Sequence, residues 1–139
     1  MNSFFYIDLP TRFRDLDALG HVNNAVYITY FEEGRKSFFL SHINEKESAF
    51  EFPFILAHIQ CDYKRSITLN DAIGLQMWVG SIGNKSFDFL YEIIDRTDKT
   101  LIYAAGKSVQ VSFDYKLQKS IPIPETLKHK LLPFLKNGA

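Results

Sequence analysis

The sequence predicts an α+β fold, in which one long helix packs against a face of an antiparallel sheet. Three observations support this prediction. A segment with apolar residues three and four positions apart follows a short N-terminal strand pattern. From residue 54 to residue 115 the apolar residues recur mostly at every second position, which is typical of strands. Short turn-like links separate these segments, and such links favour antiparallel hairpins.

The first strand is expected at residues 4–14, where aromatic and β-branched residues gather around Pro10. Proline has no backbone N–H to donate to a neighbouring strand. The first strand is therefore expected at an edge of the sheet or with a bulge.

The long helix is expected at residues 24–41, with Asn23 or Asn24 as its N-cap. At 1.5 Å per residue it would be about 27 Å long, enough to cross a small sheet. Its sheet-facing side is expected to carry Tyr27, Tyr30, Phe31, Gly34, Phe38 and Ser41. The opposite side is expected to carry the charged residues Glu32, Glu33, Arg35 and Lys36.

After the helix, a polar connector at residues 44–48 leads to four further strands. These strands are expected at residues 54–67, 72–82, 86–96 and 101–115. In the 86–96 strand, one face is expected to carry Phe87, Phe89, Tyr91 and Ile93.

The chain is expected to close with a short helix at residues 125–135, in which Pro133 breaks the last turn. A single long helix leaves part of the sheet's apolar surface uncovered. We therefore expect a second subunit to cover that surface or to extend the sheet, giving a homodimer or a homotetramer.

The composition is typical of an ordered globular protein and suggests one domain over residues 1–139. Hydrophobic residues make up 46% of the sequence and aromatic residues 15%, enough for a packed interior. The 16 basic and 16 acidic residues cancel, so no overall charge favours nucleic acid or an anionic membrane surface. The sequence shows neither a secretory signal pattern nor a run of about 18 apolar residues, and we expect a cytoplasmic location.

Cys61, the single cysteine, excludes an intramolecular disulfide and any zinc site built from several cysteines. It lies in an apolar, aromatic run, which favours a buried, inert thiol over a nucleophile. His42, His58 and His129 are scattered without the spacing of metal ligands, so no metal site is expected.

The stretch DLDALGHVNNAVY at residues 15–27 contains the polar residues best placed for chemistry, immediately before the predicted helix. A helix N-terminus carries unpaired backbone N–H groups and a partial positive charge, which can stabilise an oxyanion. A carboxylate beside it can attack an acyl carbon or activate water. The combination suggests hydrolysis of an activated acyl group. The alternative is that Asp15 and Asp17 serve only as turn or capping residues.

This stretch resembles the motif of the hotdog-fold thioesterases of the 4-hydroxybenzoyl-CoA thioesterase type, which place an acidic residue, a glycine and often HVNN before the central helix. The resemblance extends to FEEGR at residues 31–35, DYKRSITLNDAI at residues 62–73 and IPIPETLKHKL at residues 121–131. It implies a hotdog fold, with the long helix packed against a five- to six-stranded antiparallel sheet, as a single thioesterase domain. It also implies acyl-CoA thioesterase activity without a metal or redox cofactor.

The resemblance implies that Asp17, the second acid of the D-x-D pair, is the catalytic carboxylate. An aspartate that is ionised at neutral pH suits a nucleophile for the thioester carbonyl, or a charge that positions water. The donor that polarises the thioester oxygen would be the backbone N–H of Asn24, in the first turn of the helix. The side chains of Asn23 and Asn24 are either helix caps or substrate contacts.

His21 could bind water, orient the Asp17 carboxylate or hydrogen-bond the loop, and a supporting role is expected. Plant-type acyl-carrier thioesterases share the HVNN element. They place an Asn two residues after the catalytic Asp and an acid after a Y-x-R element. Leu19 and Ser66 occupy those positions here, which argues against an Asp-Asn-His relay.

By the same resemblance, Tyr63, Lys64 and Arg65 belong to the strand element beside the acyl-CoA cleft. Lys64, Arg65 and Lys85, at a predicted hairpin tip, could meet the phosphates of coenzyme A, or they are simply solvated. Ser86 matches a position where the family's backbone approaches pantetheine. Tyr27 would either line the acyl pocket or belong to the core.

Two other functions are compatible with the predicted fold. The first is a non-catalytic module that binds acyl-CoA or acyl-carrier protein and leaves the thioester intact. The second is a hotdog hydratase or dehydratase, but those enzymes usually pair a histidine and an acid in a motif that this sequence does not contain.

Overall fold

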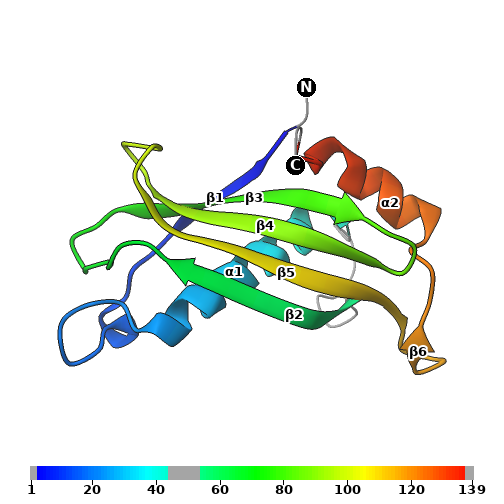
Figure 1. The fold of residues 1–139 in the computed structure, drawn as a ribbon, viewed down its shortest axis with the longest axis horizontal. Helices are drawn as coiled ribbons and strands as arrows, with labels where there is room; N and C mark the ends of the chain where they lie inside the picture. Colours follow the sequence, from blue (N-terminus) through cyan, green and yellow to red (C-terminus); the bar gives the residue numbers. More distant parts are fainter. Residues whose placement is uncertain (1–2, 44–53, 137–139) are drawn as a thin grey trace.

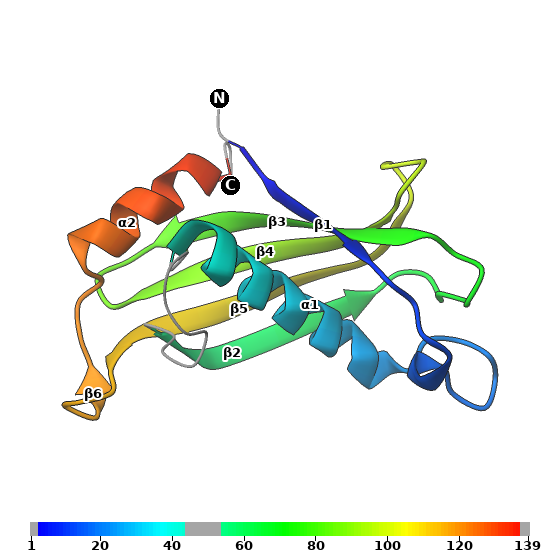
Figure 2. The same ribbon diagram turned by 180° about the vertical axis from the view of Figure 1, so that it is seen from behind.

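The computed structural model describes residues 3–43 and 54–136 and has the predicted α+β architecture. Within these ranges, one antiparallel sheet has the strand order β1-β3-β4-β5-β2, and the short β6 pairs with the end of β5. Helix α1 lies across one face of this sheet (Figure 2). The elements follow one another as β1 (Phe5–Leu9), α1 (Asn24–Phe38), β2 (Phe54–Tyr63), β3 (Ile73–Ile82), β4 (Ser86–Asp95), β5 (Ile102–Asp114), β6 (Lys119–Ser120) and α2 (Glu125–Leu131) (Figure 1).

Strand β1 is an edge strand, as Pro10 predicts, but it is shorter than the expected residues 4–14. It ends at Leu9, and the chain then forms a 3-10 turn at Phe13–Asp15. The Oδ2 atom of Asp15 accepts a hydrogen bond of 2.9 Å from the Arg12 N–H, which closes this turn. This local hydrogen bond stabilises a turn where the apolar pattern predicts a continued strand.

Asn23 is the N-cap of α1, because its side-chain oxygen accepts a 2.9 Å hydrogen bond from the Ala25 N–H. A π-helical turn at Phe39–Ile43 continues the helical segment to the expected length. Two expectations about its faces are wrong. Ser41 is exposed, because the wider π turn changes the angular spacing of side chains. Arg35 is only 9% exposed, although the pattern groups it with solvated charges.

The core lies between α1 and the sheet face that it covers. The other predicted sheet-facing residues of α1 are buried: Tyr27, Tyr30, Phe31, Gly34 and Phe38. The face predicted for β4 is buried as well: Phe87, Phe89, Tyr91 and Ile93. At the centre, the Phe31 ring stacks on the Tyr91 ring, with centroids 4.4 Å apart and an interplanar angle of 13°. This contact joins the middle of the helix to the middle of the sheet.

Strands β3, β4 and β5 match their expected ranges to within one residue at each end. β2 ends earlier than expected, because the residues after it leave the sheet. The N–H groups of Lys64 and Arg65 both donate to the Tyr103 carbonyl, and the Val22 N–H donates to the Ile67 carbonyl at 2.8 Å. The segment after β2 therefore binds the loop that precedes α1.

The C-terminal helix α2 is followed by a 3-10 turn at Leu132–Phe134, which confirms that Pro133 ends the α-helix. The sequence does not predict β6, since two residues show no periodicity. The polar connector expected at residues 44–48 lies outside the described residues. Across residues 3–43 and 54–136, no helix combines the length and the apolar character needed to cross a bilayer.

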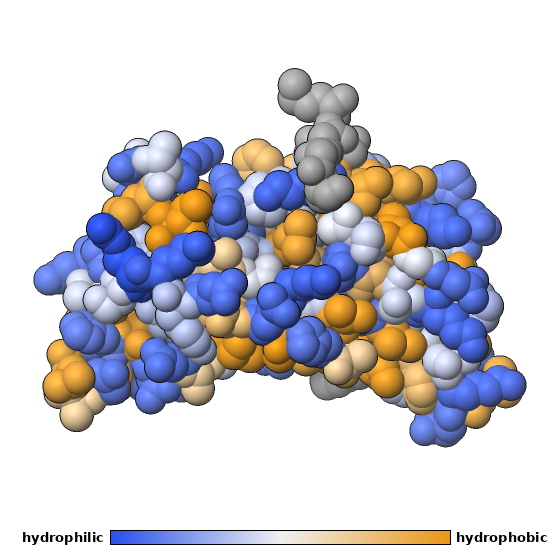
Figure 3. Space-filling view, in the orientation of Figure 1, coloured by the Kyte–Doolittle hydropathy of each residue, from blue (hydrophilic) through white to orange (hydrophobic). Residues whose placement is uncertain are grey.

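Helix α1 covers only one face of the sheet, and Figure 1 views the other face. Apolar patches lie among polar side chains on this second face (Figure 3). Leu90, Val109 and Val111 are half-buried on it. At the β2 edge, Ile55 and Leu56 are 39% and 45% exposed. The apolar surface that the sequence predicts to remain uncovered is therefore present in the single chain.

Candidate active site

The loop between β1 and α1 is held as a small hairpin that presents Asp17 near its tip. The Asp17 N–H donates to the His21 carbonyl at 2.8 Å, and the Gly20 N–H donates to the Asp17 carbonyl at 3.1 Å. Gly20 has a φ of 82°, a conformation that favours glycine at this turn. The Asn23 N–H donates to the Asp15 carbonyl at 2.8 Å and closes the base of the loop.

The two oxygens of the Asp17 carboxylate have different environments. Oδ1 accepts hydrogen bonds from the N–H groups of Leu19 and His21, at 2.9 and 3.2 Å. These two bonds match the turn-forming role that the sequence analysis gives as the alternative for Asp17. Within the described parts of the chain Oδ2 has no hydrogen-bond partner, and the side chain is exposed. Asp17 can therefore hold its turn with one oxygen and offer the other to a ligand.

Asp15, the first acid of the pair, has a different role, which sequence reasoning missed. It is 8% exposed, and its Oδ2 accepts hydrogen bonds from the Tyr30 hydroxyl at 3.0 Å and from the Arg12 N–H at 2.9 Å. Burial, followed by the bond to Asp15, raises the pKa of Tyr30, so its hydroxyl stays protonated and donates. Asp15 thus fastens the loop that carries Asp17 to helix α1.

Tyr30→Phe is expected to lower the free energy of unfolding by about 1.5–3 kcal/mol, because the buried Asp15 carboxylate loses a donor. Urea denaturation followed by circular dichroism measures this change. The matched control is Tyr6→Phe, which removes a hydroxyl bond of 2.8 Å to the exposed Asp8. A smaller loss is expected there, because water replaces the missing donor. Equal losses in the two variants would contradict the role given to Asp15.

The backbone N–H of Asn24, at the N-terminus of α1, is unpaired among the residues that the structure describes. The Asn23 side chain accepts from the Ala25 N–H, and the Asn23 carbonyl accepts from the Val26 N–H at 2.9 Å. Among the described residues, the Asn24 N–H makes no hydrogen bond. Because this group lies at the positive end of the helix dipole, it can stabilise negative charge on a bound oxygen.

A pocket of about 320 Å3 joins the loop, the helix N-terminus and the segment after β2. The Tyr63 hydroxyl donates to the Asn24 carbonyl at 2.9 Å, and the Tyr27 hydroxyl donates to the Arg65 carbonyl at 3.2 Å. The two tyrosine rings meet edge to face, with centroids 4.9 Å apart. The predicted site residues that line this pocket are Asp17, His21, Asn24, Tyr27, Tyr63, Lys64 and Arg65, and Val22 and Ser66 line it as well.

Three predicted site residues do not line this pocket. Asn23 is occupied as the helix cap. Lys85 and Ser86 lie at the β3–β4 hairpin, where the Lys85 carbonyl accepts from the Ser112 N–H. Lys64 and Arg65, which line the pocket, instead donate to the Tyr103 carbonyl. Tyr103 and Ser112 are nine residues apart along β5, or about 30 Å at 3.3 Å per residue. Within one chain, Lys85 and Ser86 therefore lie far from Asp17, and their contact with coenzyme A stays a prediction.

Cys61 and His42 do not line the pocket at Asp17. Cys61 is half-buried, and burial raises the pKa of its thiol to about 11, so the thiol is protonated at neutral pH. The His42 ring packs against aromatic rings, including that of Phe134, with centroids 4.8 Å apart. Among the described residues, no three His, Cys, Asp or Glu side chains gather closely enough to hold a metal ion.

Comparison with known proteins gives one consistent family. The model of the Thioesterase-like superfamily matches residues 11–131. The long-chain acyl-CoA thioesterase FadM of Escherichia coli (strain K12) is 27% identical over 122 residues, which cover 87% of this chain and 92% of FadM. The protein YsmA of Bacillus subtilis (strain 168) is 29% identical over 89 residues, which cover 63% of this chain and only 58% of YsmA.

Solved structures confirm the hotdog fold. A predicted thioesterase from Bacillus stearothermophilus is similar with a TM-score of 0.87 and 23% identity, covering 99% of this chain and 100% of that chain. A thioesterase from Thermus thermophilus, solved in complex with coenzyme A and Zn, is similar with a TM-score of 0.79 and 28% identity. That match covers 91% of this chain and 90% of the Thermus chain.

Proposed function

Because this chain belongs to the thioesterase-like superfamily, we propose that it hydrolyses acyl-CoA thioesters to a free acid and coenzyme A. Two relatives support this substrate class, since FadM is a long-chain acyl-CoA thioesterase and the Thermus thioesterase binds coenzyme A. The observation that carries the proposal lies in the pocket itself. The unpaired Oδ2 of Asp17 and the unpaired N–H of Asn24 belong to residues that line the same cavity.

In the proposed reaction the thioester carbonyl oxygen accepts a hydrogen bond from the Asn24 N–H, which stabilises the negative charge that develops there. The Asp17 carboxylate either attacks the carbonyl carbon or takes a proton from a water molecule that attacks it. The carbon–sulfur bond then breaks, and coenzyme A leaves as a thiolate that takes up a proton. In the first route, water then hydrolyses the mixed anhydride and regenerates Asp17.

The remaining pocket residues would hold the substrate in place. Lys64 and Arg65 are exposed at the rim, where their cations can meet the phosphates of coenzyme A. Tyr27 and Tyr63 form an aromatic wall beside Asn24. His21 is half-buried next to Asp17 and is suited to hold a water molecule there.

The proposal is tested by thiol release from a panel of short-chain, long-chain and aromatic acyl-CoA substrates, with acyl-carrier protein thioesters as a second carrier. The molar amount of free thiol is expected to exceed the molar amount of enzyme many times. Recovery of intact thioester after prolonged incubation, with ligand bound, would instead establish the non-catalytic acyl-CoA binding module. No turnover and no binding across the panel would overturn the proposal altogether.

We also propose that the protein is a homodimer or a homotetramer assembled through the β2 edge. β1, at the other edge, has five residues, whereas β2 has ten and carries exposed apolar side chains. An exposed strand of this length pairs readily with a second copy of itself.

Ile55→Lys is expected to shift the protein toward the monomer in sedimentation equilibrium. Leu117→Lys, at a leucine that is 60% exposed beyond β5, is the control, and the same shift in both variants would contradict this interface.

A further inference from the structure

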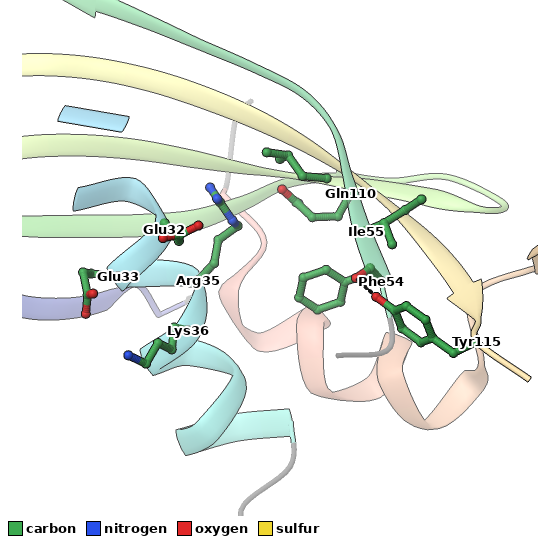
Figure 4. Close-up of a pocket in the computed structure, with 9 residues that line it drawn as sticks. Glu32, Glu33, Arg35, Lys36, Phe54, Ile55, Gln110 and Tyr115 are labelled. Carbon is green, nitrogen blue, oxygen red and sulfur yellow. Dashed lines mark hydrogen bonds between the residues drawn. The ribbon is translucent and has the colours of Figure 1, made fainter. Parts of the chain in front are cut away.

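A second pocket lies between the second half of α1 and the start of β2 (Figure 4). Its volume is about 400 Å3. Arg35 and Lys36 line it from the helix, Phe54 and Leu56 from β2, and Gln110 from β5. No residue of this pocket lines the pocket at Asp17. The second pocket therefore joins apolar walls to a buried polar base that the proposed reaction does not use.

Arg35 brings a positive charge to this base. Its guanidinium donates one hydrogen bond, from Nη1 to the Tyr91 hydroxyl at 3.1 Å. Within the described residues it has no carboxylate in ion-pair distance, although it is 9% exposed. A guanidinium has five N–H donors, so most of them remain for another acceptor. Burying a charge without a counter-ion is costly, which makes a ligand with an acceptor favourable here.

A chain of buried side chains holds Arg35 in this position from behind. The Tyr91 hydroxyl, which accepts from Arg35, is hydrogen-bonded to the Ser108 hydroxyl, and Ser108 donates to the side-chain oxygen of Gln110. The Gln110 nitrogen donates to the Phe87 carbonyl at 3.3 Å, and Ser108 and Gln110 are fully buried. Burial raises the pKa of the Tyr91 hydroxyl, so Tyr91 stays neutral and supplies no negative charge to Arg35.

In Figure 4 the Arg35 guanidinium and the Gln110 side-chain oxygen point toward one another at the inner end of the pocket. The acidic side chains that line the pocket are Glu32, which is exposed, and Glu33, which is half-buried. Neither forms an ion pair with Arg35, and water screens exposed charges. The inner end therefore offers hydrogen-bond donors and positive charge to whatever enters from the apolar side.

The two pockets are aligned along α1 and β2. Asn24 at the first pocket and Arg35 at the second are eleven residues apart, about 16 Å along a helix. Between them, the helix-facing side of β2 carries Ile59 and Cys61, which are half-buried. Cys61 pairs with Gly106, the residue that faces the Phe31 ring, which places it on that side. To reach the second pocket, an acyl chain held by its thioester at Asn24 would run along these apolar side chains.

We propose that the second pocket binds the far end of the acyl chain, and that it selects chains whose far end carries oxygen, as a carboxylate or a hydroxyl, over chains ending in methyl. The inference rests on the proposed thioesterase function and adds the substrate class to it. Arg35 is the specificity-determining residue, because its free N–H groups are satisfied only by such an acceptor. A methyl end leaves them unpaired.

The test compares dodecanoyl-CoA with its ω-hydroxy and ω-carboxy counterparts. Wild-type kcat/KM is measured by thiol release, and binding of the same thioesters to Asp17→Asn is measured by calorimetry. The oxygenated substrates are expected to be favoured about tenfold or more, the value of one charge-assisted hydrogen bond. A stronger effect for the carboxylate than for the hydroxyl identifies charge as the main attraction, and equal effects identify hydrogen bonding.

Two variants locate the preference. Arg35→Met is expected to lower kcat/KM for the oxygenated substrates alone. Because Arg35 is buried, circular dichroism checks that this variant folds. Leu56→Trp narrows the pocket from a position that is 45% exposed, and it is expected to lower kcat/KM for all three substrates while sparing butanoyl-CoA. Because Leu56 lies on the β2 edge that we propose as the subunit interface, sedimentation equilibrium checks that this variant keeps the oligomeric state of the parent. Leu117→Trp, at a position 60% exposed beyond β5, is the control and should change none of these values.

The outcomes separate this inference from the proposed function. Hydrolysis without any preference for oxygenated chains would overturn the inference and leave the thioesterase function standing, as would equal losses for all three substrates in Arg35→Met. Preferential binding to Asp17→Asn without hydrolysis by the wild type would support the second pocket and overturn the thioesterase function. If Arg35→Met does not fold, an unchanged chain-length profile in Leu56→Trp overturns the inference.

Discussion

Asp17→Asn is expected to lower kcat for thioester hydrolysis by about 10²- to 10⁴-fold, the usual loss when a catalytic acid or base is removed. The asparagine oxygen can still accept the N–H bonds of Leu19 and His21 that Oδ1 of Asp17 accepts. The turn is therefore retained while the negative charge is lost. Steady-state thiol release measures the rate, and thermal unfolding checks that stability is unchanged.

Asp114→Asn is the matched control for this prediction. The Oδ1 atom of Asp114 also accepts two backbone N–H bonds in a turn, from Lys116 and Leu117 at 2.9 and 3.0 Å. It lies at the end of β5, far from the pocket at Asp17, so the same substitution should leave kcat unchanged. If Asp17→Asn hydrolyses as fast as the parent, Asp17 is a turn residue and the catalytic group must be sought elsewhere.

Asp17→Ala adds a second measurement, because it removes both the charge and the acceptor of the turn. We expect the same loss of kcat as in Asp17→Asn, with an additional loss of stability from the Leu19 and His21 N–H groups. A loss of activity confined to Asp17→Ala would mean that the loop's shape, rather than the charge, supports the reaction.

The parts of the fold that depend on local periodicity could be predicted from the sequence. The spacing of Tyr27, Phe31 and Phe38 gives the helix and its buried face, and period two gives the strands. Asp17 and Asn24 line one pocket, as expected, because a single short loop joins them to the helix start. In each case the residues are close together in the sequence, so the backbone geometry restricts how they can be arranged.

The roles of individual charges could not be predicted in the same way. Asp15 and Asp17 are equivalent in a D-x-D pattern, and only the packing of α1 places the Tyr30 hydroxyl over Asp15. Arg35 is buried and donates to the Tyr91 hydroxyl on the sheet, and the two residues are 56 positions apart in the sequence. Lys85 was expected near the phosphates of coenzyme A as a cation at a hairpin tip, and strand length puts that tip beside Ser112, far along β5 from Tyr103. Such contacts depend on tertiary packing, which a periodic pattern does not encode.

Phe31→Ala is expected to lower the free energy of unfolding by about 3–5 kcal/mol, the range for truncating a large buried aromatic residue. Phe31 is fully buried, and its ring fills the space between Tyr91 and the backbone at Gly106. The surrounding sheet cannot collapse into the cavity, because β4 and β5 are hydrogen-bonded along their length. Urea denaturation monitored by circular dichroism gives the value. A loss below that of Tyr30→Phe would contradict the central position given to this ring.

Adding Gly106→Ala tests the same contact from the sheet side. A Cβ at Gly106 would lie 2.6 Å from Cζ of Phe31 and 2.8 Å from the Gln60 carbonyl oxygen, closer than packed atoms allow. In the parent, overpacking is expected to cost about 1–3 kcal/mol, because the stacked ring cannot move away. In the Phe31→Ala background the ring contact is gone and only the Gln60 contact remains, so the cost should be smaller. The double-mutant cycle measures this difference, and additive losses would show that the ring and the strand are not packed as described.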